Sequence, residues 1–527
     1  MFYQCMRQVN LRSLIQNLPD SSGVDIPDAT VTGIVLDSRQ VKPGDVFVAL
    51  VGENSDGHQY IDNAVDRGAV AVVGTQTITN LDVPYFKVKD GRYALAQISA
   101  AFYDFPTRKL TVIGVTGTDG KTTTSNLIYH ILQRAGIRAG MISTVNAQIG
   151  EKILDTGFHV TTPEAPDVQR YLAEMVAAGI THVVLEATSH GLDQQRVAAC
   201  DIDLSVVTNI THEHLDYHGS YEAYQAAKGR LFTELAVTQQ KEHGNPRLAV
   251  LNVDDVSFDY LLDLVKYLSP EIRVVTYGLG TSADVRGFEI LSHSVGLQFS
   301  AIVNGSQMQF VSNLVGNYNV SNCLASIAAT VVGLGVESHF AQEAIATMEG
   351  IPGRMEVIAK GQGFLAIVDF AHTPNALQNA LKTAKQLTSG RVIAVFGSAG
   401  LRDRQKRRIM AEISAEMADL TVLTAEDPRT ESLGGILSEM ADGAVSQGGV
   451  ENQTFWRVPD RGNAIRFAIG LAKPGDVVIS CGKGHEQSMC FGEVEYPWDD
   501  RTAMDAALSE FLGIKGPQMP YLPTQSE

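Results

Sequence analysis

The chain has 527 residues and a formal net charge of −18, with 44% hydrophobic and 19% charged residues. This length exceeds a single hydrophobic core and predicts about three domains, and the composition is that of a globular protein. The acidic balance argues against a nucleic-acid-binding protein, because a polyanion would be repelled. The chain has no apolar run as long as a membrane span requires.

The N-terminus and the cysteines indicate where the protein acts. Residues 1–18 lack the long apolar core and small-residue cleavage site of a signal peptide, so we expect none. The five cysteines are scattered and odd in number, which is typical of reduced thiols and offers no zinc site. We expect a cytoplasmic protein that acts as a monomer, without nucleic-acid or membrane partners.

Residues 1–107 predict a small N-terminal α/β domain, because short apolar runs alternate with turn signals before Pro106. Its expected strands are 31–36, 46–51 and 69–73.

Residues 108–350 predict a central domain with a parallel sheet. Its apolar runs end in polar residues, which is where ligands gather in open parallel sheets. The expected strands are 110–113, 183–186, 204–208 and 247–252, with further alternating strands in 277–312.

Residues 351–527 predict a C-terminal Rossmann-like α/β domain, with a loose proline-containing tail over the last dozen residues. The expected strands are 365–370, 391–397, 420–424 and 477–481.

A glycine-rich stretch from Gly114 to Thr124 separates the strand 110–113 from a predicted helix at 125–133. Backbone N–H groups and the helix dipole at such a turn attract phosphate, so the stretch predicts a P-loop for mononucleotide binding. Lys121 would reach the terminal phosphates and Thr122 would hold Mg²⁺. Val115 stands where glycine is usual, and Gly114 lies one position earlier, so the loop is a variant. The alternative is an ordinary glycine-rich turn.

Polar clusters follow several predicted strands. Three histidines and two acids lie within 212–218, and Glu186 ends another strand, so both could supply a metal ligand. The alternatives are a polar loop with surface histidines and a solvated strand end. Lys228, taken alone, is a solvated helix residue.

The C-terminal segment repeats this arrangement. Asp369 and His372 lie at a strand end, and a basic cluster at 402–408 follows the turn 397–400, where it could hold anionic groups. The alternative for the cluster is a solvated helix face. Residues 426–429 and 482–486 each follow a strand, so they lie on one sheet edge or are simple turns.

In this order the motifs resemble the Mur ligase family of peptidoglycan synthesis, and within it the tripeptide synthetases, over about residues 30–510. The segments that carry the resemblance are Asp37-Ser38-Arg39, 42–49, 56–58, Thr161-Thr162-Pro163, 186–192 with Arg196, the His214 loop, 226–228, 369–374, Arg402-Asp403 with Lys406-Arg407, and 482–486.

The resemblance implies an acid–amino-acid ligase. It would use ATP to add a diamino acid to the D-glutamate of UDP-N-acetylmuramoyl-L-alanyl-D-glutamate through an acyl phosphate, releasing ADP and phosphate. Residues 1–107 would bind the UDP substrate, 108–350 would bind ATP, and 351–527 would bind the incoming amino acid.

The resemblance also implies residue roles. The residues implied for ATP are Thr116, Gly117, Thr118, Gly120, Lys121, Thr122, Thr123, Asn319, Asn322, Arg354, Asp369 and His372. Those implied for the UDP substrate are Ser38, Thr161, Thr162, Thr188 and Arg196. Those implied for the amino acid are Arg402, Glu426, Asp427, Arg429, Gly482 and Glu486. Metal ligands would be Thr122, Glu186, His214 and Lys228. Catalysis would rest on Lys121, Glu186, His214 and Lys228, with Lys228 carbamylated to N6-carboxylysine.

The choice of diamino acid depends on residues 426–429. Relatives that use meso-diaminopimelate usually have Asp-Asn-Pro-Arg here, whereas this chain has Glu426-Asp427-Pro428-Arg429. Asp427 would repel a second carboxylate and attract a distal ammonium group, which slightly favours lysine or ornithine. Arg429, Gly482 and Glu486 match the diaminopimelate pattern, so meso-diaminopimelate is the alternative.

Two other functions are more remote. The first is another ligase of the superfamily, such as a folylpolyglutamate synthase or the enzyme that adds D-alanyl-D-alanine, and the segments 37–49 and 482–486 argue against both. The second is a non-catalytic P-loop nucleotide switch, which would leave Lys228 and the basic cluster without a role.

Overall fold

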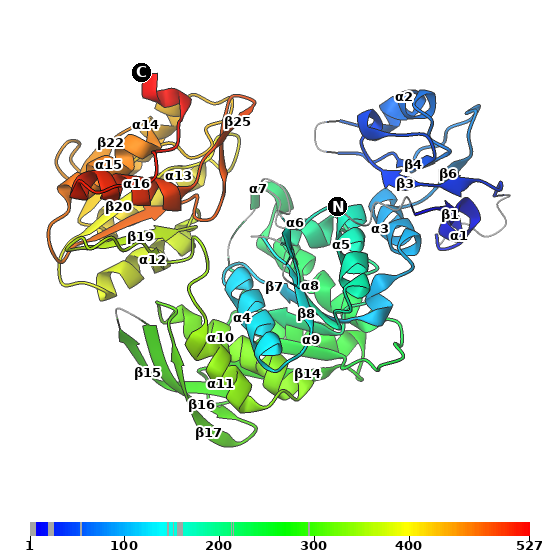
Figure 1. Ribbon diagram of the computed structural model, residues 1–527, viewed down its shortest axis with the longest axis horizontal. Helices are drawn as coiled ribbons and strands as arrows, with labels where there is room; N and C mark the ends of the chain where they lie inside the picture. Colours follow the sequence, from blue (N-terminus) through cyan, green and yellow to red (C-terminus); the bar gives the residue numbers. More distant parts are fainter. Residues whose placement is uncertain are drawn as a thin grey trace.

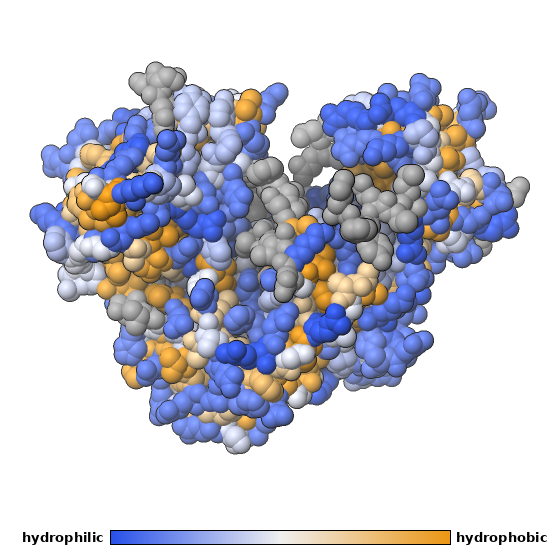
Figure 2. All heavy atoms as spheres, in the orientation of Figure 1, coloured by the Kyte–Doolittle hydropathy of each residue, from blue (hydrophilic) through white to orange (hydrophobic). Residues whose placement is uncertain are grey.

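The computed structural model describes residues 7–18, 26–52, 55–144, 147–150, 152–154, 162–211, 213, 215–293 and 296–526. Three α/β regions follow one another along the chain, each built on its own sheet, and the blue N-terminal and the yellow-to-red C-terminal regions flank the central one (Figure 1). On the face shown in Figure 2, hydrophilic residues cover most of the surface, and a hollow separates the two flanking regions.

The N-terminal region has a parallel sheet in the order β3-β4-β5-β6. Its strands are β3 (Gly33–Val35), β4 (Asp45–Val48), β5 (Ala71–Gly74) and β6 (Tyr85–Lys87). Its other elements are β1 (Val9–Asn10), α1 (Leu11–Ile15), β2 (Thr30–Val31), η1 (Ser38–Gln40), η2 (Gly57–Tyr60), α2 (Ile61–Asp66), α3 (Gly91–Phe102) and η3 (Pro106–Lys109). The three strands expected here are confirmed to within a few residues.

The central region contains an eleven-stranded sheet in the order β10-β9-β8-β11-β7-β12-β13-β14-β15-β16-β17. Its strands are β7 (Thr111–Thr116), β8 (Ala139–Ile142), β9 (Ala147–Ile149), β10 (Lys152–Leu154), β11 (His182–Glu186), β12 (Leu204–Val207), β13 (Leu248–Asn252), β14 (Arg273–Gly278), β15 (Val285–His293), β16 (Gly296–Val303) and β17 (Ser306–Ser312). Strands β8 and β11 to β14 run parallel with β7. The alternating strands expected at 277–312 are present as β15, β16 and β17, where β15 pairs parallel with β14 and the three pair antiparallel with one another.

Helices cover both faces of this sheet, because alternate residues of a buried parallel strand point to opposite sides. In β7, Ile113 and Val115 join one core and Val112 joins the other. Helices α4 (Lys121–Arg134), α10 (Tyr318–Ile327), η4 (Ala328–Gly333) and α11 (Ser338–Thr347) supply the first core. The second face carries α5 (Ala165–Ala177), α8 (Tyr221–Val237) and α9 (Phe258–Leu268), with the short α6 (Ser189–Asp193) and α7 (Leu215–His218) nearby.

The C-terminal region has a six-stranded sheet in the order β18-β19-β23-β20-β21-β22, parallel except for β18. Its strands are β18 (Glu356–Val357), β19 (Leu365–Asp369), β20 (Val392–Phe396), β21 (Leu420–Leu423), β22 (Phe455–Arg457) and β23 (Val477–Cys481), with the hairpin β24 (Ser488–Phe491) and β25 (Val494–Pro497). Its helices are α12 (Pro374–Gln386), α13 (Gln405–Met417), α14 (Leu433–Ser446), α15 (Arg461–Leu471), α16 (Asp500–Leu512) and η5 (Pro523–Ser526).

The chain end is packed rather than loose, which corrects the expectation of a free tail. Leu522 is fully buried in the core beneath α15 and α16, and Met519 packs against that core. The Thr524 hydroxyl donates to Asp460 at 2.9 Å. Burial of these apolar groups outweighs the lack of regular structure that the prolines impose.

The two larger sheets bring their polar strand ends together. The carboxyl ends of β7, β11 and β12 share one edge of the central sheet, and those of β19, β20, β21 and β23 share one edge of the C-terminal sheet. Side chains from the C-terminal region contact the loop after β7. Among the described residues, no helix combines the length and the apolar character needed to traverse a bilayer.

Candidate active site

The glycine-rich loop joins the central strand β7 to helix α4, as a P-loop requires. Gly120 adopts φ +80°, and a Cβ atom there would lie 2.3 Å from the Asn322 side-chain oxygen, so only glycine fits. The Lys121 ammonium group donates to the Thr118 carbonyl oxygen at 2.8 Å, within the loop itself. This places a cation and the first N–H groups of a 14-residue helix around one small space.

Gly114 has a different role from the one its sequence position suggested. It lies inside β7, where a Cβ atom would approach a Leu231 methyl group of α8 to 2.7 Å. The phosphate turn itself begins at Gly117, with φ +150°. Gly114 therefore allows close packing of α8 on the sheet, and the variation in the motif lies outside the turn.

Oxygen ligands lie next to the loop. The Glu186 carboxylate, fully buried at the end of β11, accepts hydrogen bonds from the Thr122 hydroxyl at 3.1 Å and from the Thr144 hydroxyl at 2.8 Å. Mg²⁺ binds proteins through one or two carboxylates and hydroxyl oxygens together with phosphates, so this donor set fits the ion. His214, the third expected ligand, and Thr161 lie outside the described residues, and the described part holds no cluster of three metal-binding side chains.

Lys228 faces the nucleotide loop instead of solvent, which corrects its interpretation as a solvated helix residue. The side chain is only 2% exposed, its ammonium group donates to the Gly117 carbonyl oxygen at 2.6 Å, and it lies 4.6 Å from the Tyr224 ring centre. Burial, reinforced by the nearby Lys121, holds the pKa of the Lys228 amine well below its ordinary value. Lys228 is therefore an amine that loses its proton unusually easily.

The residues expected to complete the nucleotide site come from both regions. Asn322 of α10 contacts Asn319 at 2.9 Å and approaches the loop at Gly120. Arg354, in the linker before β18, donates to the Thr122 hydroxyl at 3.4 Å and lies 4.5 Å from the Phe370 ring centre. The Arg354 side chain thus connects the C-terminal region to the loop.

Asp369 and His372 fix the conformation of this linker and of the carboxyl end of β19. The Asp369 carboxylate accepts from the N–H groups of Met355 and Ala371 at 2.7 and 2.8 Å. His372 contacts the Phe370 carbonyl oxygen at 3.0 Å, and burial lowers its pKa to about 4, so it is neutral near pH 7. Asp369 therefore orients the chain segment that carries Arg354.

Three of the residues expected to bind the UDP substrate lie together in the central region. The hydroxyl groups of Thr162 and Thr188 are 3.1 Å apart, and the Arg196 guanidinium donates to the Thr162 carbonyl oxygen at 2.7 Å. Ser38 is buried in the N-terminal region, in η1, apart from this group. A cavity of about 470 Å³ beside α8, lined in part by Tyr217 and Arg230, opens near the same group.

Sequence reasoning missed Gln194 in this group. Its side-chain oxygen accepts from the Arg196 guanidinium at 2.7 Å, and its amide nitrogen donates to the Tyr217 hydroxyl at 3.3 Å. The available signal was a glutamine just beyond α6 and two positions before a charged residue. Gln194 now links Arg196 to the cavity beside α8.

The amino-acid end of the site contains a buried charge cluster. The fully buried Lys483 ammonium group contacts both Asp427 carboxylate oxygens at 3.0 Å and the Glu486 carboxylate at 2.5 Å. The N–H of Cys490 also donates to Asp427 at 2.9 Å. Asp427 is therefore neutralised and its hydrogen-bonding capacity is largely used within the protein.

Other residues expected at this end differ in environment. Arg429 adopts φ +53° against the β24–β25 hairpin, and its half-buried guanidinium has no ion pair or hydrogen bond to the described residues. Glu426 is buried beside Gly482, with one carboxylate oxygen unpaired in the described part, and burial raises its pKa to about 6. The amino-acid end of the site thus offers the Arg429 guanidinium as an available cation and the Glu426 carboxyl group, which binds a proton easily.

Most of the basic cluster at 402–408 pairs with glutamates of the C-terminal region itself. Arg404 and Arg407 contact Glu439 of α14, and Arg408 contacts Glu412 one turn along its own helix. Arg402 is exposed. The Lys406 ammonium group donates instead to the His372 carbonyl oxygen at 3.2 Å, at the end of β19. Glu439 lies 32 positions from Arg407 in the chain, so this pairing could not be read from local spacing, whereas Arg408–Glu412 has the i,i+4 spacing of a helical pair.

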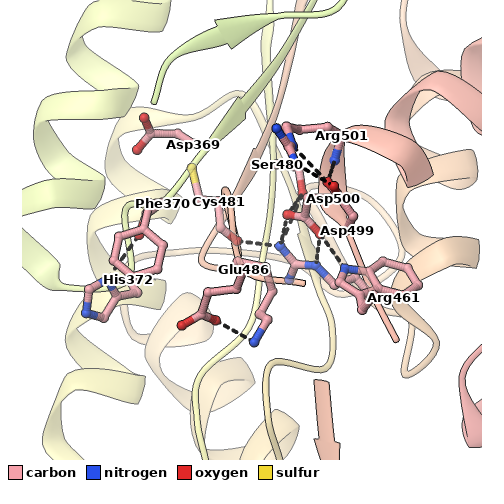
Figure 3. A network of polar contacts seen from close by, with 12 residues as sticks. Asp369, Phe370, His372, Arg461, Ser480, Cys481, Glu486, Asp499, Asp500 and Arg501 are labelled. Atoms are coloured by element: carbon pink, nitrogen blue, oxygen red, sulfur yellow. Dashed lines mark hydrogen bonds and ion pairs between the residues drawn. The ribbon is translucent and has the colours of Figure 1, made fainter. Parts of the chain in front are cut away.

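A buried network holds the strand ends that carry this site. The Arg461 guanidinium donates to Asp500 at 2.6 and 2.7 Å and to the Cys481 carbonyl oxygen at 2.7 Å (Figure 3). It also donates to the Ala425 carbonyl oxygen at 3.2 Å. Asp500 also accepts from Trp498 at 2.8 Å. Because Ala425 and Cys481 directly precede Glu426 and Gly482, Arg461 fixes the spacing between the two loops of the amino-acid site.

Comparison with known proteins agrees with this architecture. The chain matches the models of the Mur ligase family catalytic domain at residues 30–103, the Mur ligase middle domain at 115–330 and the Mur ligase glutamate ligase domain at 353–484. It is 40% identical to a UDP-N-acetylmuramyl-tripeptide synthetase of Roseiflexus sp. (strain RS-1), over 96% of this chain and 100% of that protein.

Two further relatives carry a fuller description. A UDP-N-acetylmuramoyl-L-alanyl-D-glutamate–2,6-diaminopimelate ligase of Geobacillus thermodenitrificans (strain NG80-2) is 39% identical over 95% of this chain and 100% of that protein. A solved structure described by the same activity has a TM-score of 0.66 at 30% identity, covering 96% of this chain and 99% of that one.

Three consecutive α/β domains, with a P-loop in the second and an arginine-bearing third domain in contact with it, define an ATP-dependent acid–amino-acid ligase. The chain belongs to the Mur ligase family, and its relatives place it with the tripeptide synthetases, the MurE type. The family and fold class expected from the sequence are both confirmed.

Proposed function

We propose that this enzyme adds a diamino acid to the D-glutamate carboxylate of UDP-N-acetylmuramoyl-L-alanyl-D-glutamate during peptidoglycan precursor synthesis. The observation that carries the proposal is the convergence of Lys121, the Thr122–Glu186 pair and buried Lys228 on one nucleotide loop. The names of the full-length relatives supply the substrate class.

The reaction requires ATP because an amine does not attack a free carboxylate at a useful rate. The substrate carboxylate attacks the γ-phosphorus of ATP, which forms the acyl phosphate and releases ADP. The amine then attacks the acyl carbon, phosphate leaves, and the amine loses a proton. Lys121 offsets charge on the transferring phosphoryl group, and closure of the C-terminal domain excludes water that would hydrolyse the acyl phosphate.

Thr122 and Glu186 are the described residues that would hold Mg²⁺, which would supply further neutralisation of phosphate charge. We propose that the Lys228 amine reacts with CO₂ to give a carbamate and a proton. The resulting carboxylate would lie beside the loop and extend this oxygen-rich ligand set. The buried, easily deprotonated amine supports this modification, because only the neutral amine is nucleophilic.

Each of the three regions would bind a different part of the substrates. Residues 1–107 would bind the uridine end through Ser38, residues 108–350 would bind ATP and the peptide end, and residues 351–527 would bind the incoming amino acid. Thr162, Thr188 and Arg196, now joined by Gln194, would hold the muramoyl dipeptide next to the cavity beside α8.

We propose meso-diaminopimelate as the amino acid, which reverses the slight preference for lysine. That preference rested on Asp427 as an uncompensated charge, and the ion pair with Lys483 removes the reason. Arg429 is available to pair with the second carboxylate of diaminopimelate, whereas lysine has no such group. The relatives named 2,6-diaminopimelate ligases add support.

The decisive experiment is to incubate the enzyme with ATP, the UDP-muramoyl dipeptide and each of lysine, ornithine and meso-diaminopimelate, and to weigh the products. We expect a mass increase equal to diaminopimelate minus water, with one ADP formed per product. A non-catalytic nucleotide switch would give no product, and a folylpolyglutamate-type ligase would leave this dipeptide unchanged. A product with lysine alone would restore the original preference.

Selectivity should follow Arg429 rather than Asp427. Arg429→Ala is expected to lower kcat/KM for diaminopimelate by about 10- to 100-fold, which is the effect of losing a charge-assisted pair. The kcat/KM for lysine, already lower in the wild type, should change little. Asp427→Asn should alter the ratio of the two kcat/KM values by less than about threefold, because Lys483 already neutralises Asp427. Arg408→Ala, which removes an exposed arginine of the same region, is the control. Equal losses for both amino acids in Arg429→Ala would contradict the assignment.

A cytoplasmic location and a monomeric state belong to the same proposal. The described cysteines, Cys200, Cys323, Cys481 and Cys490, are free thiols, which supports a reducing compartment.

A further inference from the structure

One side-chain contact between the C-terminal and central regions has no role in the site as described above. The Asn375 amide nitrogen, at the start of α12, donates to the Asp119 carboxylate of the nucleotide loop at 2.8 Å. The two residues are 256 positions apart in the chain, so the contact exists only when the C-terminal region lies against the loop.

The backbone of Asp119 is bound entirely to the central region. Its N–H donates to the Asn209 side-chain oxygen at 3.0 Å, and its carbonyl oxygen accepts from the Thr208 hydroxyl at 2.6 Å. Its side chain, in contrast, accepts the Asn375 hydrogen bond across the domain boundary. Asp119 therefore connects the end of β12, through the loop, to the other domain.

The position of Asn375 is rigid. It is the second residue of α12, whose first turn is capped by the Thr373 hydroxyl accepting from the Ala376 N–H at 3.2 Å, and Pro374 restricts the preceding backbone. The same strand end carries His372, which contacts Lys406. Because the short Asn375 side chain is carried on a capped helix start, ordering it against Asp119 costs little conformational entropy.

We propose that Asn375 is a positioning residue that acts through Asp119 to hold the C-terminal domain closed over the nucleotide loop. Asp119 directly precedes Gly120 and Lys121, so the contact sets the geometry of the residues that meet the phosphates. When the C-terminal domain moves away, the Asp119 carboxylate loses the amide donor of Asn375, and the loop loses its hydrogen bond to that domain. The contact thus couples domain closure to a loop geometry that favours nucleotide binding. The proposal rests on ATP-dependent ligation and is independent of which diamino acid is used.

The test exchanges the two groups. Asn375→Asp opposes two carboxylates, and we expect kcat to fall by roughly tenfold or more and a fluorescent ATP analogue to dissociate faster. The fold should survive, because an acidic residue in the first turn favours the helix dipole. The double variant Asp119→Asn with Asn375→Asp restores a donor and an acceptor, and it should recover most of the kcat lost in Asn375→Asp.

Asn379→Asp is the matched control, since Asn379 lies one turn further along α12 and its side chain has no hydrogen bond to the described residues. It should leave kcat and analogue dissociation within about twofold of wild type. Equal behaviour of Asn375→Asp and Asn379→Asp, or additive losses in the double variant for both ligation and analogue dissociation, would overturn the proposal. Failure of the wild-type chain to make any ligated product would instead reject the proposed function.

Discussion

Lys121→Ala is expected to lower kcat for ligation by about 1,000-fold, because the variant loses the cation that offsets charge on the transferring phosphoryl group. The ammonium group lies at the start of α4 and contacts the Thr118 carbonyl oxygen at 2.8 Å, from where it can turn toward bound phosphates. The side chain is half-buried, and the hydrogen bond it makes is local, so the fold and its melting temperature should be unchanged.

The measurement separates the two chemical steps. ADP release with the UDP substrate and without amino acid reports acyl-phosphate formation, and product mass reports ligation. Arg134→Ala, in the last turn of the same helix, removes an equivalent charge that pairs with Glu343 at 3.4 Å and should be nearly as active as wild type. ADP release near the wild-type rate in Lys121→Ala would remove Lys121 from the phosphoryl-transfer step.

The second large effect is expected at Lys228. Lys228→Ala should reduce ligation by about 100- to 1,000-fold, because it removes the group beside the loop that becomes the carbamate carboxylate. Bicarbonate should not restore activity in the variant, since no amine remains to react. Acetate or propionate should restore part of it by occupying the vacated space.

Lys228 differs from the other buried lysines in a way that makes the modification selective. Lys241 and Lys483 are paired with Asp203 and Asp427, whereas Lys228 has no carboxylate within ion-pair distance in the described part of the chain. An ion pair keeps an amine charged and unreactive toward CO₂, while burial without one favours the neutral form.

Carbon-13 NMR with labelled bicarbonate tests this directly. The wild-type protein should show one slowly exchanging carbamate signal that Lys228→Ala lacks. The control variant Lys382→Ala, in helix α12 of the C-terminal region, should retain it. Since removing a buried amine also removes its desolvation cost, the melting temperature of Lys228→Ala should not fall appreciably. Near-normal activity in Lys228→Ala, or the same carbamate signal in it, would remove the modification from the mechanism.

Much of the architecture could be read from local patterns. The strands at 110–113, 183–186, 204–208 and 247–252 are present as β7, β11, β12 and β13, because continuous apolar runs of this length are stable only when buried on both faces. The glycine-rich turn after β7 was visible for the same reason, since glycines and Lys121 coincide at a strand-to-helix junction. The end of the chain was predicted wrongly, because prolines indicate irregular backbone and do not indicate whether the segment packs.

The sequence alone therefore determined the fold class, the nucleotide loop and, through its resemblance to a family, the kind of reaction. Only the tertiary structure decided what each polar residue faces. Lys228 was interpreted as a surface lysine until α8 placed it against the loop. The cluster at 402–408 was interpreted as an anion-binding group until Glu439 of α14 was found to pair with Arg404 and Arg407. Asp427 was interpreted as a free charge until Lys483 was found beside it. The reason is physical: apolar periodicity is recorded between neighbours in the chain, whereas the charge state and availability of a side chain depend on partners up to hundreds of residues away.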